Sequence, residues 1–429
     1  MYEFKKIKLM TFLLLTSSSS FAGSSYNNNF DNVLNGVLSA SKEIKSLEKE
    51  KDATKQTYDA QKMFFLPTFK TGLEGKEFFG DIEPNPKTTG DAFFNMDSKL
   101  FGTAVFNNID SAMYANKASI EDLSQKEVEL YYLVLLKMVR IEYARIFLKN
   151  SDALRDMIED YKEKIVISVQ QGVTPQSENQ QSNLTLLKYN QLYDDIEASI
   201  DKNFDDIVNE TGFEIENRRE TGLNKEIVKK IRKLVDEVDI NKMNIDDIVL
   251  MSYKLKSKKN SFLSEKEKAL GQYERAKLTF NTEVHSNLIK TEEEPAYNLK
   301  NNSFIGLRLD VDLFDYSKYK SQKAGILRAE ATELSLSKEE DKIRSLVKST
   351  INDINSFKQK RISFQEQIEL SKKIIKTQEK ELYIDKVTYA DLMETIYTYF
   401  DLYKKYLDNE IGMAEKLFEL MKIRTEKIL

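Results

Sequence analysis

Residues 305–313 read IGLRLDVDL, and every second side chain in this stretch is a branched aliphatic one. The positions between them hold a glycine, an arginine and two aspartates. A period of two is typical of a β-strand with one apolar face and one charged face. On this pattern alone, a soluble sandwich whose charged face meets water is the simpler interpretation.

Three further segments alternate in the same way, and each has about the 9–11 residues that a tilted membrane strand requires. Polar stretches at 80–90 and 290–302, which carry Pro84, Pro86 and Pro295, are expected to form extracellular turns. The predicted strands cover residues 64–79, 92–106, 276–289 and 303–314. Their charged side chains are expected to face a common lumen: Lys70, Glu74, Asp97, Lys99, His285, Arg308, Asp310 and Asp312.

Four strands cannot close a membrane barrel, because the smallest stable barrels have about eight. An open edge in lipid would leave backbone groups unpaired at a cost of several kcal/mol each. Two copies of the chain would supply about eight strands and three copies about twelve, and a conducting lumen favours the larger number. The sequence therefore predicts an oligomer if these strands lie in a membrane.

Two long helices are permitted because neither glycine nor proline occurs between Gly102 and Gly172 or between Gly325 and Gly412. They are predicted over residues 108–171 and 317–384, each near 100 Å at about 1.5 Å per residue. Apolar residues recur every seven positions in the second helix, which indicates a coiled-coil seam. Polar residues interrupt this seam at Arg361, Ser371 and Gln378.

The order helix, strand, strand, long helix, helix is predicted twice, with Phe106 and Phe314 at matching places about 210 residues apart. A repeat of this length indicates a duplicated domain. The expected division is a signal peptide over 1–22, a first repeat over 23–212, a linking region over 213–243 and a second repeat over 244–429.

The chain begins as an exported protein would. Lys5, Lys6 and Lys8 precede an apolar run over 9–15, and Ala22 fits a cleavage site. The apolar run is shorter than the roughly 20 residues that a membrane-spanning helix needs, so membrane insertion is expected to use strands. Cysteine is absent, which excludes a disulfide framework, a thiolate metal site and a lipid anchor on cysteine.

Enzymatic and nucleic-acid-binding functions are disfavoured. His285 is the only histidine, and glycine is too sparse for a phosphate-binding loop. The formal net charge is −5 with both signs intermixed, which is typical of solvated helix faces and not of a nucleic-acid footprint. No cofactor is expected.

Several short motifs together resemble the TolC-like outer-membrane factor (outer membrane efflux protein) family, over essentially the whole mature chain. They are FLPTF at 65–69, VFNN at 105–108, LFDY at 313–316, QGVTPQSEN at 171–179, VNETG at 208–212 and DKVTYADLMETIYTYFDLYKK at 385–405.

The resemblance implies an α+β membrane protein in the bacterial outer membrane, extending into the periplasm. It implies a homotrimer whose twelve-stranded β-barrel continues as a long periplasmic α-helical barrel with a closable tip. Residues 213–243 would form a belt of short irregular elements. The implied partners are a periplasmic adaptor (membrane fusion) protein and an inner-membrane transporter of the RND, ABC or MFS type.

The same resemblance implies a functional tip. Asp391 and Glu394 match carboxylates that narrow the entrance, and rings of like charge from three chains would favour cations. The competing interpretation is that Asp391 caps a helix and Glu394 completes a capping box. Gly172, Val173 and Thr174 match the adaptor-contacting turn.

Glu178 follows that turn, and Val387 stands where the family often has a basic residue that holds the tip closed. Neighbouring Lys386 is the substitute, so an ion pair between Glu178 and Lys386 is the hypothesis for a lock.

The main alternative function is a soluble periplasmic coiled-coil scaffold, which would explain export and heptads but leave the strands as incidental hairpins. A scaffold would appear in the soluble periplasmic fraction, whereas a channel would pellet with the outer membrane. Drug efflux and type I protein export remain equally compatible with the sequence.

Overall fold

A computed structural model describes residues 28–77, 86–223, 225–237, 244–291, 298–382, 384, 386–425 and 427. The predicted signal peptide lies outside these residues, as do Pro84, Pro295 and the centres of both predicted turns. Pro86 was expected in the first turn but is the first residue of a strand, a position where proline is tolerated.

The expected succession of elements occurs twice. The first unit is α2 (Lys42–Lys62), β1 (Thr68–Glu77), β2 (Pro86–Gly102), α3 (Val105–Gln170) and α4 (Gln176–Thr211). The second is α7 (Tyr253–Leu270), β3 (Ala276–Thr291), β4 (Asn298–Val311), α8 (Tyr316–Leu382) and α9 (Tyr389–Arg424). The remaining helices are α1 (Asn28–Ala40), α5 (Lys225–Glu237) and α6 (Ile245–Met251).

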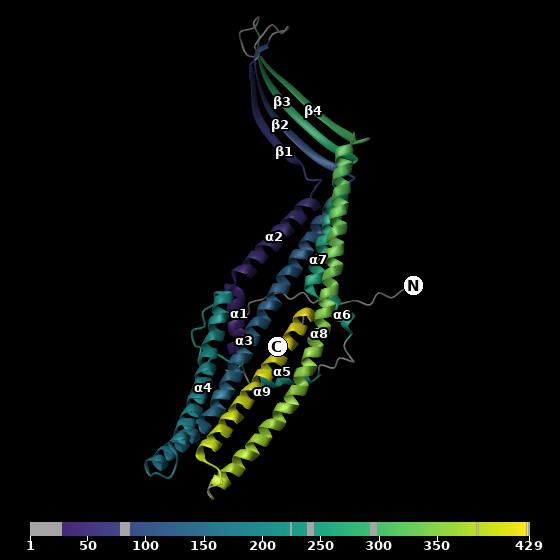
Figure 1. Ribbon diagram of the computed structural model, residues 1–429. Helices are drawn as coiled ribbons and strands as arrows, with labels where there is room; N and C mark the ends of the chain where they lie inside the picture. Colours follow the sequence, from purple (N-terminus) through teal and green to yellow (C-terminus); the bar gives the residue numbers. More distant parts are fainter. Residues whose placement is uncertain are drawn as a thin grey trace.

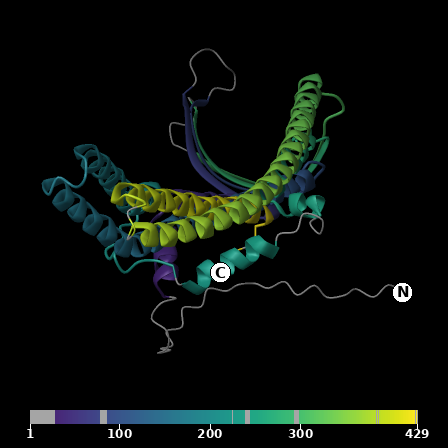
Figure 2. The ribbon, with the colours of Figure 1, turned by 60° about the horizontal axis from the view of Figure 1, so that its bottom comes forward.

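The long helices form one curved layer (Figures 1 and 2). α3 packs against α2 and α4 on one side and against α7 and α9 on the other, and α8 completes the layer against α7 and α9. α3 has 66 residues and α8 has 67, since no proline interrupts either of them. In Figure 2, α5 lies on the convex side of this layer.

All four strands form one antiparallel sheet in the order β1-β2-β3-β4 at one end of the helical layer (Figure 1). β2 and β3 come from different repeats, yet they pair along almost their whole length, from Pro86 opposite Thr291 to Gly102 opposite Lys277. Within the described residues, β1 and β4 each pair on one side only. The sheet therefore has two open edges.

Several expectations about local structure were wrong. Residues 64–67 and 312–314 were expected in strands but lie outside β1 and β4, and residues 86–90, 290–291 and 298–302 were expected in turns but lie in strands. Residues 103–106 were expected in a strand, but β2 ends at Gly102 and Ala104 is already the N-cap residue of α3. The linking region was expected to be irregular, but it contains α5, a helix of 13 residues. Its apolar Val228, Ile231 and Val235 recur at helical spacing and are buried, which explains why a helix forms there.

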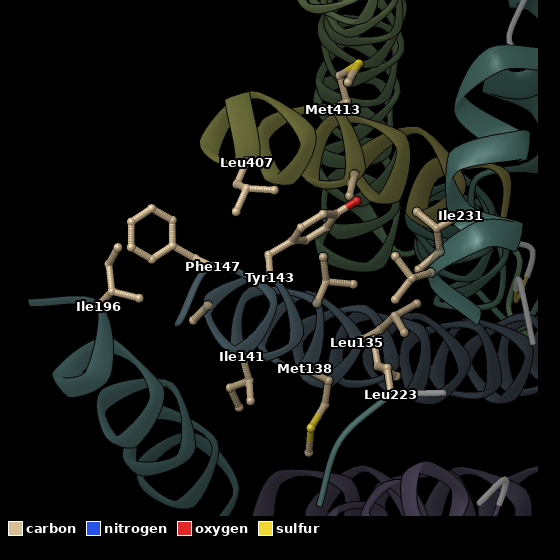
Figure 3. Close-up of a cluster of buried hydrophobic side chains, with 14 of the residues drawn as sticks. Leu135, Met138, Ile141, Tyr143, Phe147, Ile196, Leu223, Ile231, Leu407 and Met413 are labelled. Carbon is tan, nitrogen blue, oxygen red and sulfur yellow. The ribbon is translucent and has the colours of Figure 1, made fainter. Parts of the chain in front are cut away.

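The main core lies where α3 passes α5 and α9. In Figure 3, Tyr143 and Phe147 of α3 lie on the side of Leu407 and Met413 of α9, whereas Met138 and Ile141 point from the opposite side of α3. Ile231 of α5 and Leu223 from the loop before α5 belong to the same core. Every one of these residues is buried. The α3 side chains labelled in the figure are Leu135, Met138, Ile141, Tyr143 and Phe147.

Replacing Leu135 with alanine removes a fully buried side chain from this core. We expect Leu135→Ala to lower the free energy of unfolding by about 2–5 kcal/mol, because the surrounding side chains cannot fill the cavity. Thermal unfolding followed by circular dichroism measures the effect. Leu250→Ala, at an exposed position of α6, is the control and is expected to change stability by less than about 0.5 kcal/mol. Equal shifts in the two variants would contradict this core assignment.

Candidate functional site

The charged side chains of the four strands lie on one face of the sheet. Cross-strand pairs such as Lys70 with Asn95, His285 with Phe93 and Asp310 with Lys277 share a face, and residues two apart on a strand do as well. This register places on the charged face Lys70, Glu74, Asp97, Lys99, His285, Arg308 and Asp310. Asp312 lies one residue beyond the end of β4 and forms an ion pair with Lys318.

Polar contacts occur on the charged face both between strands and within a strand. His285 Nδ1 lies 2.8 Å from an Asp91 carboxylate oxygen, and its Nε2 lies 3.5 Å from Glu283. Arg308 Nε donates to Asp310 over 2.8 Å, and Lys99 pairs with Glu274. These groups make the face polar, and their side chains remain partly exposed to solvent.

The opposite face is apolar and open. Leu73 is 87% exposed and Ile305 is 72% exposed, although aliphatic side chains are normally buried. An exposed apolar patch of this extent marks a surface that meets another protein or a membrane. The other exposed members of the face are Phe69, Phe94, Val284, Leu307, Leu309 and Val311.

Aromatic side chains gather where the sheet joins the helices. Phe106 at the start of α3 and Phe314 just after β4 are both largely exposed, and Phe65, Tyr316 and Tyr319 lie exposed near the same strand ends. Aromatic rings concentrate at this height in membrane strands, where the bilayer meets water. The sequence offered this signal through the matching places of Phe106 and Phe314, but the extent of the cluster was missed.

In the described part of the chain, each helix is too short or too polar to cross a lipid bilayer. Within the same residues, His, Asp and Glu side chains never gather in groups of three or more that could hold a metal ion.

The turn between α3 and α4 lies at the end of the helical layer opposite the sheet (Figure 1). Gly172 has a left-handed backbone (φ 73°), and its N–H donates to Val169 O over 3.0 Å. Val173 N–H donates to Ser168 O, also over 3.0 Å, which completes a Schellman motif. Glycine adopts this φ without the steric cost of a Cβ, and the motif leaves Val173 76% exposed at the tip.

The second turn, between α8 and α9, ends in a capping box. Thr388 is the N-cap residue, and its hydroxyl accepts a hydrogen bond from Asp391 N–H over 3.1 Å. The Asp391 carboxylate in turn accepts from the Thr388 N–H and hydroxyl. Asp391 is thus the third helical residue of α9 and not its cap, and Glu394 takes no part in the box.

Hydrogen bonds tie α4 to α9 just above the two turns. Ala390 N–H donates to a Glu178 carboxylate oxygen over 3.4 Å. Glu394 accepts a hydrogen bond from the Thr185 hydroxyl over 2.9 Å and lies 3.7 Å from Lys188 Nζ. The structure therefore brings Glu178 and Glu394 into one contact zone between the two helical hairpins.

The hypothesised ion pair between Glu178 and Lys386 is not formed in the described part of the chain. Glu178 accepts a hydrogen bond from a backbone amide of α9. The Lys386 side chain is exposed, and the backbone N–H of Lys386 donates to Glu381 O. The contact that joins the two turns thus uses a helix N-terminus, where a carboxylate is favoured by the unpaired N–H groups.

No protein-family model matches the chain, and no curated protein sequence matches it either.

Solved structures match over nearly the whole length. The outer-membrane channel OprN superposes with a TM-score of 0.73 at 10% identity, covering 95% of this chain and 93% of that one. The Campylobacter jejuni CmeC outer membrane channel gives 0.73 at 10% identity, with 97% and 92% covered. The outer membrane protein VceC from Vibrio cholerae gives 0.73 at 8% identity, with 93% and 97% covered.

These similarities concern the path of the whole backbone, helices and sheet together, and they agree with the motifs at the strand ends and turns. The chain has the fold of the TolC-like outer-membrane channels.

Proposed function

We propose that this protein is the exit-channel subunit of a tripartite efflux or type I secretion system in the bacterial outer membrane. In this function it conducts substrates passively from an inner-membrane transporter to the outside. The observation that carries the proposal is the four-stranded sheet, which combines an exposed apolar face, a charged face and two open edges.

The apolar face of the sheet is unfavourable in water, and the unpaired edges of the sheet are unfavourable in lipid. An exposed face of aliphatic and phenyl groups favours a bilayer, where unpaired backbone groups at β1 and β4 would cost several kcal/mol each. Pairing β4 of one copy with β1 of the next removes both edges. Three copies of the four strands give a barrel of twelve, wide enough for an aqueous lumen lined by the charged face.

The helical layer continues the same assembly in this proposal. Three copies of the curved layer close into an α-helical barrel in the periplasm, and the belt is formed by residues 213–243 around α5. The duplicated units over 23–212 and 244–429 supply equivalent walls. A signal peptide over 1–22 directs the chain across the inner membrane.

The tip is the proposed entrance. Exposed Val173, presented by Gly172 beside Thr174, offers a small apolar contact for a periplasmic adaptor protein. Asp391 and Glu394 lie within one turn of α9, and three copies would place their carboxylates in stacked rings that favour cations. The transporter partner is of the RND, ABC or MFS type.

A soluble coiled-coil scaffold is the second candidate function, but it leaves the exposed apolar face without an occupant. Fractionation separates the two functions. A channel pellets with the outer membrane and appears as a trimer with a long stalk in images of the detergent-solubilised protein. A monomer in the soluble periplasmic fraction would refute the proposal.

The two faces of the sheet predict opposite responses to the same new charge. Leu307→Lys places an ammonium group on the apolar face, and we expect it to weaken membrane insertion by about 2–4 kcal/mol if the residue lies near the bilayer midplane. Asn281→Lys places the same group on the charged face, opposite Asp97, and is the matched control. Folding into vesicles, titrated with urea, measures both. Equal loss in the two variants would show that the two faces do not meet different environments and would contradict the assignment of the apolar face to lipid.

The carboxylate rings predict ion selectivity. In planar bilayers, we expect the wild-type channel to prefer cations and the Asp391→Asn, Glu394→Gln double variant to lose this preference, since the fixed negative charge at the entrance is gone. The reversal potential in a salt gradient measures the change. The control is Asp201→Asn with Asp205→Asn, two α4 residues that pair with Arg218 instead. Unchanged selectivity in the tip variant would remove the ring assignment.

A further inference from the structure

A single buried carboxylate joins three helices in the lower half of the helical layer. Glu410 of α9 has a side chain that is only 1% exposed. Arg361 of α8 donates to both of its oxygens, over 2.5 Å from Nε and 3.2 Å from Nη2. Arg232 of α5 approaches the second oxygen at 3.0 Å. The two arginines satisfy a charge that burial would otherwise make costly.

The same network also includes Tyr143 of α3 and a second residue of α5, Asp236. Arg361 Nη1 donates to Asp236 over 2.6 Å, so this side chain links α8 to α5 as well as to α9. Arg232 Nε donates to the Tyr143 hydroxyl of α3 over 3.1 Å. Burial raises the pKa of Tyr143 to about 12, so its hydroxyl stays neutral beside the arginine. One carboxylate therefore organises contacts among α3, α5, α8 and α9.

The network occupies a polar layer in the α8–α9 seam. Here Asn409 donates to Phe357 O over 3.0 Å, and Gly412 lets the Phe357 ring approach α9, since a Cβ at that glycine would lie 2.8 Å from the ring. Arg361 is the first polar residue that interrupts the heptads in the sequence.

Apolar packing resumes on both sides of this layer. On the sheet side, α8 buries Val347, Ile351 and Ile354, and on the tip side it buries Ile368 and Ile375. The polar layer thus divides the α8–α9 pair into an arm toward the sheet and an arm toward the tip.

Stability alone does not account for such a layer. Buried ion pairs lose about as much by desolvation as they gain, and apolar replacements of similar volume are often neutral or stabilising by about 1–4 kcal/mol. Polar layers in coiled coils instead fix register and partner. The geometry here fixes the tip arm of α8–α9 to α5, on the convex side of the layer (Figure 2).

We propose that Glu410 and Arg361 are positioning residues that latch the tip arm of α8–α9 to α5 and thereby fix the width of the entrance. The inference rests on the proposed channel function. With the latch intact, the tip arm keeps one position relative to α3 and α5. With the latch removed, the arm moves about the polar layer, and the entrance takes a wider range of widths.

The test exchanges the ion pair for apolar side chains. The Arg361→Met, Glu410→Met double variant keeps volume in the seam and leaves Arg232 and Asp236 at positions that reach solvent. We expect a folded trimer with a Tm within a few degrees of wild type. We also expect the ratio of open to closed channel in planar bilayers to change about tenfold, within the usual range of coupling between sites.

Distances between spin labels measure the position of the tip arm directly. The chain has no cysteine, so Lys373→Cys on the exposed surface of the tip arm introduces a single site for a spin label. Distances between labels on different copies report the width of the entrance. The distances are expected to be narrowly distributed with the native pair and broadly distributed in the double methionine variant.

A second buried carboxylate supplies the matched control. Glu339 of α8 contacts Lys254 and Lys258 of α7 and Lys342 of its own helix, on the sheet side of the polar layer. Glu339→Met removes a comparable charge cluster without touching the latch. It is expected to leave both the label distances and the open-to-closed ratio at their wild-type values.

The outcomes separate the latch from the channel function. Wild-type distances and gating in the double methionine variant would overturn the latch, as would the same change in Glu339→Met. A double variant that does not assemble would show that the ion pair serves folding, and it too would overturn the proposal. A wild-type protein with no pore and no distances between copies would instead reject the proposed function.

Discussion

Backbone hydrogen bonding at the edges of the sheet is the constraint on which the rest of the structure depends. The central pairs are complete: β1 pairs with β2, β2 with β3 and β3 with β4. The outer edges of β1 and β4 have N–H and C=O groups that the described chain does not satisfy. Water tolerates such edges and hydrocarbon does not. In the proposed channel the apolar face meets hydrocarbon, so other copies of the chain complete the edges, and the helical layer must let those copies approach.

The helical layer meets that requirement through uninterrupted length and close packing. α3 lies in the middle, with aromatic and aliphatic side chains buried against α5 and α9, while α2 and α8 lie at the margins of the layer. The apolar contacts between these helices are interrupted at two levels by buried or partly buried polar groups. At the tip these groups tie α4 to α9, and at the polar layer they tie α8 and α9 to α5.

Much of this architecture was predictable from periodicity. Alternation over 305–313 and the absence of glycine and proline over two long intervals predicted the sheet and the long helices. The α5 helix was missed although Val228, Ile231 and Val235 have helical spacing, because the segment is short and rich in lysine. The end of β2 was misplaced because Leu100 lies in a bulge that has no counterpart in the alternation.

The side-chain contacts of the tip were less accessible. Which groups of two turns meet depends on how their helices are rotated against each other, and local sequence does not encode that rotation. Glu178 therefore finds the amide of Ala390 and not the ammonium group of Lys386. The importance of Glu410 was hidden for the same reason, since one glutamate in a polar helix gives no signal until Arg232 and Arg361 are seen around it.

The pairing of β2 with β3 has a consequence for biogenesis. The two strands are neighbours in space but are separated in the chain by α3, α4, α5, α6 and α7. Residues 86–102 therefore cannot find their partner until the polypeptide has been synthesised at least as far as β3. Helical hairpins such as α3–α4 have local contacts and can form early, whereas long-range strand pairing is slow. During this interval the aliphatic side chains of the unpaired strands are exposed, and such surface favours aggregation until the sheet is complete.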